Sequence, residues 1–444
     1  MKYNYDQVID IIQNTRRFGN LTGYEVSKQM LEQLGNPQSG IPFVHVAGTN
    51  GKGSTTAFLC KILEQTGKKV GMFTSPHLIT FEERIRINGT YISKEDVTRL
   101  GNKLLETEFN VSPTMFDYCL AMAMLYFKEQ DCDIVVIETG IGGRYDSSNA
   151  LGVPEVAVIT KIGFDHMAVL GDTIEEIANE KAGIIKEGGL VVTSPQEDAV
   201  KTVLYDCFTK VNAVQYYEIS QSDISYVKTI PMKMTGAYQL ENAATAVAAA
   251  KMLFEKWEKE QRFVATEEEQ ERYLREGISN AFWKGRMEIV NDNPFFMIDG
   301  AHNGHGVHAL AESLKALYPG EKFHFIMGVM ADKDYEEMIE ELLPLAIDFV
   351  TVTPESNRAL QSKDLAECIT KKGINARYAD DMEAVIRPFL PQHNSITKDI
   401  TVVKPSDKEV HVYLTHATEK TVAFGSLYFI GAIEAMLEEN NKRL

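Results

Sequence analysis

The chain has 444 residues, a formal net charge of −18 and 44% apolar residues. This length favours two domains, and the negative charge disfavours a nucleic acid or a membrane surface as partner, because both attract clustered lysine and arginine. Five cysteines without C-x-x-C spacing, no membrane-length apolar run and no signal-peptide core predict a soluble cytoplasmic protein with reduced thiols.

In the first part of the chain, short β-branched runs alternate with helix-length amphipathic segments, which is typical of a parallel α/β sheet. We predict strands over residues 41–48, 68–76, 132–140 and 155–160, and a helix over 54–67. Polar or glycine-rich residues end each strand. Ligands of open α/β sheets bind at that edge.

A helix is predicted over 239–256, and strand–helix alternation then restarts after a short polar stretch. The predicted strand segments are 295–303, 322–330 and 347–354, with a helix to Tyr318 and a last apolar segment over 421–432 that continues into a buried helix. The predicted boundaries are 1–284 for the first domain, 285–293 for a linker and 294–444 for the second domain. A hairpin or long loop is expected over 388–420.

The stretch HVAGTNGKGSTT links the first strand to its helix. Its spacing departs from the usual phosphate loop because Gly53 follows Lys52. Glycines there let backbone N–H groups converge on an anion at a helix N-terminus. Lys52 would supply positive charge to phosphates, and Ser54 a hydroxyl near a metal. A plain strand–helix turn is the alternative, but the sequence Gly-Lys-Gly-Ser favours phosphate binding.

Three further strand ends carry ligand-type side chains, namely Ser75, Glu138 and His166. A carboxylate at such an edge suits Mg²⁺, which prefers hard oxygen ligands, although a solvated strand-end glutamate is the alternative for Glu138. Lys181 lies on a helix that otherwise carries apolar residues. In the second domain, Asp299 and His302 follow a strand, and the linker contributes Arg286.

Taken together, the motifs GTNGKGS, SPHL, ETGIGGRYD, EKAGIIK, WKGRME, DGAHN and GSLYFIG resemble those of the folylpolyglutamate synthase/dihydrofolate synthase family, a branch of the Mur ligases, in the same order. The resemblance implies an α/β fold: a P-loop mononucleotide-binding ATPase domain with a mostly parallel sheet, and a smaller Rossmann-like C-terminal α/β domain. It implies a monomeric ligase that forms carbon–nitrogen bonds. This enzyme would add L-glutamate to dihydropteroate, to reduced folates or to both, with ATP and two Mg²⁺ ions.

The resemblance also assigns roles to individual residues. ATP would be bound by Gly48, Thr49, Asn50, Gly51, Lys52, Gly53, Ser54, Asn242, Arg286 and Asp299. The Mg²⁺ ligands would be Ser75, Glu138, His166 and Lys181, the last as a carbamate. The acceptor would contact Phe81, Arg84, Thr114, Met115, Phe116, Asp117, Tyr145, Asp146 and Ser147, with the loop 81–86 closing over it. Lys52, Lys181 and His302 would be catalytic, with His302 and Ser426 near the glutamate.

Two positions depart from the family pattern, since Tyr238 stands where a histidine is usual and Ser148 where a threonine is more frequent. Two rival functions stay open at this point. One is a cell-wall Mur ligase that acts on a UDP-muramoyl peptide, and the other is a nucleotide-binding module without ligase chemistry.

Overall fold

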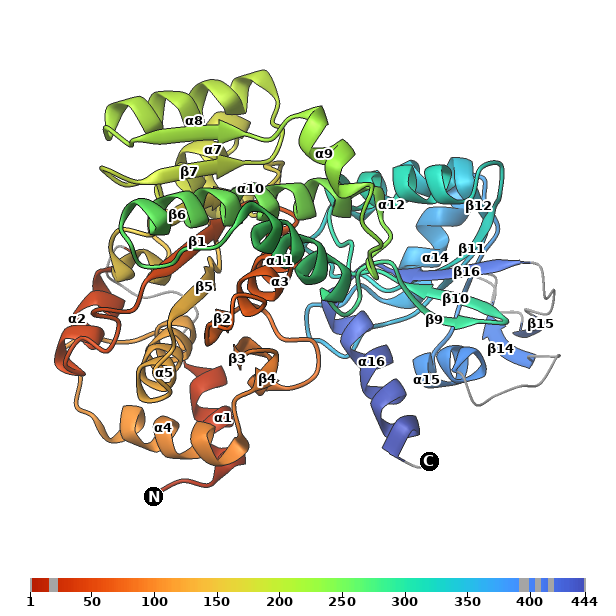
Figure 1. The fold of residues 1–444 in the computed structure, drawn as a ribbon. Coiled ribbons are helices and arrows are strands. Elements are labelled where there is room, and N and C mark those ends of the chain that lie inside the picture. The colour runs from red at the N-terminus through yellow and green to blue at the C-terminus, as the bar shows by residue number, and fades with distance from the viewer. Residues whose placement is uncertain (1, 16–22, 391–398, 404–408, 414–418, 443–444) are drawn as a thin grey trace. The chain divides into compact units, whose positions relative to one another are not determined.

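The computed structural model describes residues 2–15, 23–390, 399–403, 409–413 and 419–442 (Figure 1). The chain divides into two compact units, each described here by itself. Unit 1 comprises Met1–Lys233 and Gln239–Phe282, and unit 2 comprises Met234–Tyr238 and Trp283–Leu444. No helix among the described residues is long and apolar enough to cross a membrane.

Unit 1 is built on an eight-stranded sheet in the order β4-β3-β2-β5-β1-β6-β7-β8. Its strands are β1 (Phe43–Ala47), β2 (Val70–Phe73), β3 (Ile85–Ile87), β4 (Thr90–Tyr91), β5 (Ile134–Glu138), β6 (Val156–Ile159), β7 (Leu190–Thr193) and β8 (Gln215–Glu218). The six strands from β2 to β8 in that order run parallel, and only β3 and β4 are antiparallel. Every residue of β1 is buried, as expected for a central parallel strand.

The helices of this unit are α1 (Tyr5–Asn14), α2 (Glu25–Gln33), α3 (Lys52–Glu64), α4 (Lys94–Glu106), α5 (Met115–Glu129), α6 (Met167–Leu170), α7 (Ile174–Ala182), α8 (Asp198–Lys210), α9 (Gln221–Val227), α10 (Ala237–Lys259) and α11 (Glu267–Asn280), with 3₁₀ turns η1 (Phe81–Arg84) and η2 (Ser147–Leu151). The first two residues of α10 belong to unit 2. Capping boxes at Thr114 and Thr173 fix the starts of α5 and α7, because their side chains satisfy N–H groups that a helix start leaves unpaired.

Unit 2 is built on a second eight-stranded sheet in the order β15-β14-β13-β12-β11-β16-β10-β9. The strands are β9 (Glu288–Asp292), β10 (Phe295–Ile298), β11 (Phe323–Met327), β12 (Ala346–Thr351), β13 (Ala376–Tyr378), β14 (Asp399–Val403), β15 (Glu409–Tyr413) and β16 (Lys420–Phe424). The helices are α12 (Gly304–Leu317), α13 (Tyr335–Leu342), α14 (Ser362–Lys371), α15 (Met382–Ile386) and α16 (Leu427–Lys442), with 3₁₀ turns η3 (Leu343–Leu345) and η4 (Arg387–Phe389).

The predicted α/β class with two mostly parallel sheets is confirmed, and all the predicted strands are present. The predicted linker 285–293 differs, since its residues 288–292 form β9 and pair antiparallel with β10. The polar character of these residues predicts an irregular segment, but an edge strand tolerates polar residues because one side of it faces water. Within 388–420, the antiparallel pair β14 and β15 fits the expected hairpin, and residues 391–398, 404–408 and 414–418 lie outside the described ranges.

Candidate active site

The sheet register of unit 1 brings the predicted ligand residues to one edge. β1 lies between β5 and β6, with Val46 aligned to Glu138 and Ala47 to Ile159. On the far side of β5, Phe73 of β2 aligns with Ile137. The segments that leave β1, β2, β5 and β6 therefore start at the same edge of the sheet, which is the ligand-binding edge of open α/β sheets.

The glycine loop that follows β1 is held by the segment that leaves β6. The backbone N–H groups of Thr49 and Asn50 donate to the carbonyl of Lys161 at 3.0 and 3.3 Å, and the Thr160 hydroxyl donates to the carbonyl of Asn50 at 2.7 Å. These two amides are therefore engaged by the protein. The amides of the first turn of α3 remain to face an anion, because a helix start supplies them with no intrahelical acceptor.

Gly51 caps α3 with a left-handed backbone, φ 86°. A Cβ at this position would lie 2.3 Å from Oδ1 of Asn242. The Asn242 amide donates to Gln239 at 2.9 Å, and Gln239 donates to the Ser54 hydroxyl at 3.1 Å. α10 thus packs closely on the loop, and both the conformation and the space at position 51 require glycine.

Two lysine side chains converge on one carbonyl of this loop. Lys52 donates to the carbonyls of Gly48 and Thr49 at 3.1 and 3.2 Å, and Lys181 of α7 donates to the same Gly48 carbonyl at 2.8 Å. Lys181 is buried, and burial, together with the charge on Lys52, lowers its pKa to about 7. No ion pair with a described carboxylate involves either lysine, so this edge holds cationic groups that an anionic ligand would neutralise.

The predicted metal ligands are brought together in part. The backbone N–H of Ser75 donates to the Glu138 carboxylate at 3.2 Å, and Glu138 is buried. His166 caps α6 with φ 52° and exposes 44% of its side chain. Among the described residues, no group of three His, Cys, Asp or Glu side chains is arranged to hold a metal. The oxygen atoms of Glu138 and Ser75 nevertheless fit Mg²⁺, whose sites use one or two carboxylates and several waters.

Asp117, predicted to contact the acceptor, is saturated by protein donors. Its carboxylate accepts from the Ser27 hydroxyl, from the Ser147 hydroxyl at 2.7 Å, and from both the backbone N–H and the hydroxyl of Thr114 at 2.7 Å. A carboxylate offers about four acceptor positions. Asp117 thus ties the start of α5 to α2 and to the loop after β5.

Asp146 is saturated in the same way. It accepts from the backbone N–H groups of Gly140, Ile141 and Ser148 at 2.9, 3.0 and 3.0 Å, and from the Ser148 hydroxyl. Burial raises its pKa, against these hydrogen bonds. The Asp146 carboxylate is thus held by protein donors in this structure, and its contact with the acceptor stays a prediction.

The other predicted acceptor residues divide by exposure. Phe81 is buried in the hydrophobic core of unit 1, and Arg84 is buried and donates to Nδ1 of His77 at 2.8 Å. Met115 and Phe116 are half-buried at the start of α5. Tyr145 exposes 57% of its surface, so it is the residue of this set most available to a ligand. The closing movement predicted for loop 81–86 stays a prediction.

The loop after β5 also packs on the helix that carries Lys181. Arg144 donates its backbone N–H to the carbonyl of Glu180 at 2.7 Å. A Cβ at Gly143 would lie 2.8 Å from the carbonyl oxygen of Lys181, and one at Gly183 would lie 2.3 Å from Cα of Arg144. The glycines therefore permit a close backbone approach that places the predicted acceptor loop beside the buried lysine.

Comparison with known proteins decides the family. Residues 46–250 match the model of the Mur ligase middle domain, and residues 285–406 match that of the Mur ligase glutamate ligase domain. The chain is 37% identical to a dihydrofolate synthase/folylpolyglutamate synthase of Bacillus subtilis (strain 168), over 86% of this chain and 92% of the relative. The chain belongs to the folylpolyglutamate synthase/dihydrofolate synthase family.

Other members of the family agree with this assignment. A folylpolyglutamate synthase of Lacticaseibacillus casei is 32% identical over 80% of this chain and 87% of that protein. The crystal structure of the Thermotoga maritima folylpolyglutamate synthase has 28% identity and a TM-score of 0.76, with 98% of this chain and 97% of that chain covered. A structure described as an FPGS–AMPPCP–folate complex has 27% identity and a TM-score of 0.76, over 98% and 100% of the two chains. The predicted family and the predicted ligase class are thus confirmed.

In unit 2, Asp299, which is predicted to contact ATP, lies in a buried hydrogen-bond network. Its carboxylate accepts from the Tyr238 hydroxyl at 2.8 Å, from the Met287 N–H at 2.9 Å and from the Ala301 N–H at 2.8 Å. Burial raises the Asp299 pKa, while the Arg286 charge opposes that rise. Tyr238, noted in the sequence only as a departure from the family, therefore positions Asp299.

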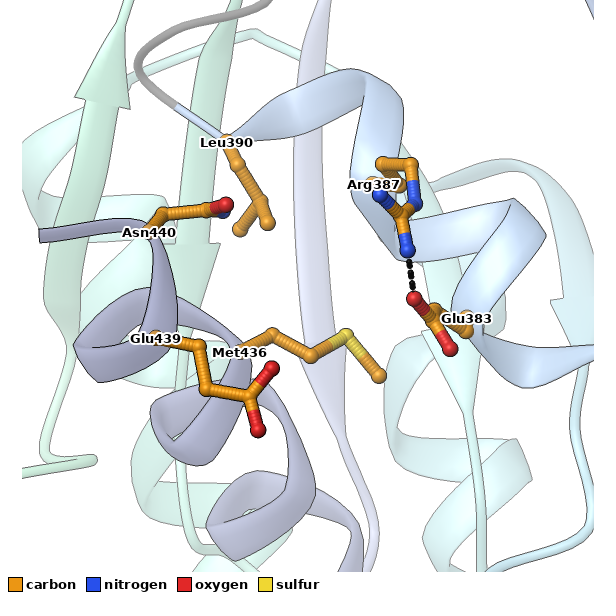
Figure 2. Close-up of a pocket in the computed structure, with 6 residues that line it drawn as sticks. All are labelled: Glu383, Arg387, Leu390, Met436, Glu439 and Asn440. Atoms are coloured by element: carbon orange, nitrogen blue, oxygen red, sulfur yellow. Dashed lines mark ion pairs between the residues drawn. The ribbon is translucent and has the colours of Figure 1, made fainter. Parts of the chain in front are cut away.

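The two remaining predicted residues of unit 2 make local contacts. His302 Nδ1 lies 2.8 Å from the carbonyl oxygen of Gly300, and the Ser426 hydroxyl accepts from the Phe429 N–H at 3.1 Å near the start of α16. A small hollow elsewhere in this unit is lined by Glu383, Arg387, Leu390, Met436, Glu439 and Asn440, and Figure 2 shows Arg387 paired with Glu383. None of the predicted site residues lines this hollow.

Proposed function

We propose that this family member joins the amino group of L-glutamate to a carboxyl group of dihydropteroate, of a reduced folate or of both, and converts ATP to ADP and phosphate. The observation that carries the proposal most directly is the position of Lys52, which starts α3, donates to the Gly48 and Thr49 carbonyls and forms no ion pair with a carboxylate among the described residues. Such a cationic edge beside a helix N-terminus suits a polyphosphate.

In the proposed reaction, an oxygen of the acceptor carboxylate attacks the γ-phosphorus of ATP and displaces ADP. The acyl phosphate then reacts with the glutamate amine, which forms the amide bond, releases phosphate and loses a proton. Lys52 and the first-turn amides of α3 would neutralise the charge that accumulates on the transferred phosphoryl group. Exclusion of water from the acyl phosphate would protect the intermediate from hydrolysis.

Mg²⁺ is proposed as the metal, with Glu138 and Ser75 as its oxygen ligands and His166 as a further one. When bound, Mg²⁺ would supply positive charge to the phosphates. We propose that Lys181 carries a carbamate. A buried amine with a lowered pKa is partly neutral near pH 7, and only a neutral amine adds CO₂, so this environment favours the modification. Arg286 and Asp299 stay predicted ATP contacts, and His302 and Ser426 predicted glutamate contacts.

The acceptor is proposed from the relatives, which are named for dihydrofolate and folylpolyglutamate synthesis, and from the solved complex with AMPPCP and folate. The half-buried Phe116 and the exposed Tyr145 would supply apolar surface to an aromatic acceptor. We further propose that the enzyme works as a monomer in the cytoplasm.

The test is ADP release by the purified chain with ATP, Mg²⁺ and L-glutamate, with dihydropteroate or tetrahydrofolate as acceptor. We expect release that depends on both glutamate and acceptor. Release that needs a UDP-muramoyl peptide instead would support a cell-wall ligase. Slow hydrolysis indifferent to acceptor and glutamate would support a nucleotide-binding module without ligase chemistry.

A further inference from the structure

The motif HVAGTNGKGS begins with a histidine that belongs to none of the predicted sites. His45 lies on β1, three residues before Gly48, and is fully buried. Its Nε2 lies 2.7 Å from the hydroxyl oxygen of Ser148, which is also fully buried. The imidazole thus reaches from the central strand to the loop after β5, which carries the predicted acceptor residues Tyr145 and Ser147.

The direction of this hydrogen bond follows from proton counting. The Ser148 hydroxyl has one proton, and it donates that proton to the Asp146 carboxylate, which as an ionised group only accepts. The hydroxyl oxygen must then accept from His45, so Nε2 carries the imidazole proton. Nδ1 is left as a bare acceptor. Consistently, Nδ1 is buried and has no hydrogen-bond partner, since an orphaned acceptor is tolerated more readily than an orphaned N–H.

The chain His45–Ser148–Asp146 therefore runs in one direction and ends on a carboxylate that also accepts from the N–H groups of Gly140 and Ile141. If the His45 N–H is removed, the Ser148 oxygen loses a hydrogen-bond donor and the Ser148 side chain can rotate. Asp146 would then lose one of its four donors. The loop that this carboxylate organises also touches the backbone of Lys181 at Gly143, so a shift there reaches the predicted reaction site.

A purely apolar residue at position 45 would pack in β1 with its neighbours, which are all buried. Burial of an imidazole in this place costs free energy, because its Nδ1 has no hydrogen-bond partner. The imidazole stays neutral, because burial and the charge of Lys186 lower the His45 pKa to about 3. His45 therefore donates the same hydrogen bond throughout the working pH range.

We propose that His45 is a positioning residue for the acceptor: through Ser148 and Asp146 it fixes the 140–148 loop in the conformation that binds the acceptor. The inference rests on the proposed function. A residue of β1, the strand that precedes the phosphate loop, would then affect how tightly the acceptor binds.

The test compares His45→Met, which removes the donor, with His45→Gln, whose amide N–H can replace it. For His45→Met we expect the KM of the acceptor to rise roughly tenfold to a hundredfold, the range for one buried acceptor left unsatisfied, while the KM of ATP and kcat change little. His45→Gln should recover most of this loss. Ser148→Ala should match His45→Met, and the double variant should be no worse than either single one.

Val44→Ala is the matched control, since Val44 is equally buried on β1 and points to the opposite face. It should lower the thermal midpoint without raising the KM of the acceptor selectively. If His45→Met changes all three substrate KM values alike, or if His45→Gln fails to rescue, the positioning role is wrong. If the wild-type chain shows no ADP release that depends on acceptor and glutamate, the proposed function has failed instead.

Should His45→Met not fold, Ser148→Ala and Ser148→Thr decide the matter. Threonine keeps the hydroxyl and should retain the KM of the acceptor, whereas alanine should not. Equal effects of the two substitutions would overturn the proposal.

Discussion

Two neighbouring regions of unit 1 differ in whether protein groups compensate their charged side chains. At the phosphate loop, Lys52 and Lys181 donate only to backbone carbonyls. In the acceptor region, Asp117 and Asp146 are each saturated by four protein donors. In the first region, the cationic charge has no carboxylate partner among the described residues, so an anionic ligand would neutralise it. In the second region, protein donors already fill the acceptor positions of the carboxylates, so the loops keep a fixed conformation before a ligand binds.

The difference separates two ways in which a protein prepares a site. Unneutralised cations bring charge to a ligand whose own charge changes during the reaction, and they cost stability when the site is empty. Saturated carboxylates instead hold loops in place before the ligand arrives. Substitutions in the first region should therefore reduce turnover more than stability, and substitutions in the second should reduce stability and acceptor binding.

The largest effect is expected at Lys52. Lys52→Ala should lower kcat by at least ~10²-fold, the scale of one electrostatic group in a transition state, with little change in the thermal midpoint. Lys61→Ala on the same helix is the control, because Lys61 is half exposed and pairs with Glu64. Steady-state ADP release checks both. Near-normal turnover of Lys52→Ala would remove the lysine from the mechanism.

In the acceptor region, Asp117→Ala should destabilise unit 1 by at least about 2 kcal/mol, since it leaves several buried donors unpaired. Asp223 is a matched control, because it fills the same position of a capping box, at the start of α9, but its side chain is more exposed. Asp223→Ala should cost about 1 kcal/mol or less. Denaturant unfolding measures both, and equal losses would contradict the account of Asp117 as a central clamp.

Gly51→Ala should lower kcat/KM for ATP roughly tenfold, because it adds both backbone strain and a clash with Asn242. Gly67→Ala is the control, since Gly67 has a similar φ of 79° but nothing within 4 Å of its missing Cβ. Gly67→Ala should add backbone strain without a clash and should leave kcat/KM for ATP unchanged. The two variants would behave alike only if the packing of α10 on the loop were unimportant.

Near neutral pH the smallest effect on stability is the one from Lys181, and it grows as the pH rises. Its pKa is about 7 in the folded chain and near 10.5 for a lysine side chain exposed to water, so between these pH values the unfolded chain binds a proton that the folded chain does not. Stability should then rise with pH over this window, relative to Lys181→Met, with a slope approaching about 1.4 kcal/mol per pH unit. Chemical unfolding at pH 6 to 10 in CO₂-free buffer measures it. Parallel curves for the two proteins would contradict a buried, uncompensated ammonium group.

The sequence predicted most of the fold, because core strands such as β5 and β6 are short apolar runs followed by polar or glycine-rich residues. It also indicated Gly48 and Lys52 through the Gly-Lys-Gly-Ser loop, and Lys181 through the family resemblance, whereas the shared contact of the two lysines with the Gly48 carbonyl is visible only in the structure. It missed Tyr238, His45 and Ser148 as positioning residues. Their roles depend on contacts between segments more than 60 residues apart, and one sequence carries no local signal for such pairs.

The same limit explains the carboxylates. The family resemblance identified Asp117 and Asp146 as site residues, but a resemblance does not record where the donors lie. Ser27, which completes the Asp117 site, is separated from it by 90 residues. Edge strands such as β9 were missed because solvent on one side lets polar residues occupy them.

The central claim, phosphoryl transfer from ATP to an acceptor carboxylate followed by attack of glutamate, is tested most directly with dihydropteroate labelled with ¹⁸O in its carboxylate. During turnover with ATP, Mg²⁺ and L-glutamate, the account predicts one ¹⁸O atom in each inorganic phosphate released, together with ADP and the amide product. Unlabelled phosphate, or AMP with pyrophosphate in place of ADP, would contradict it.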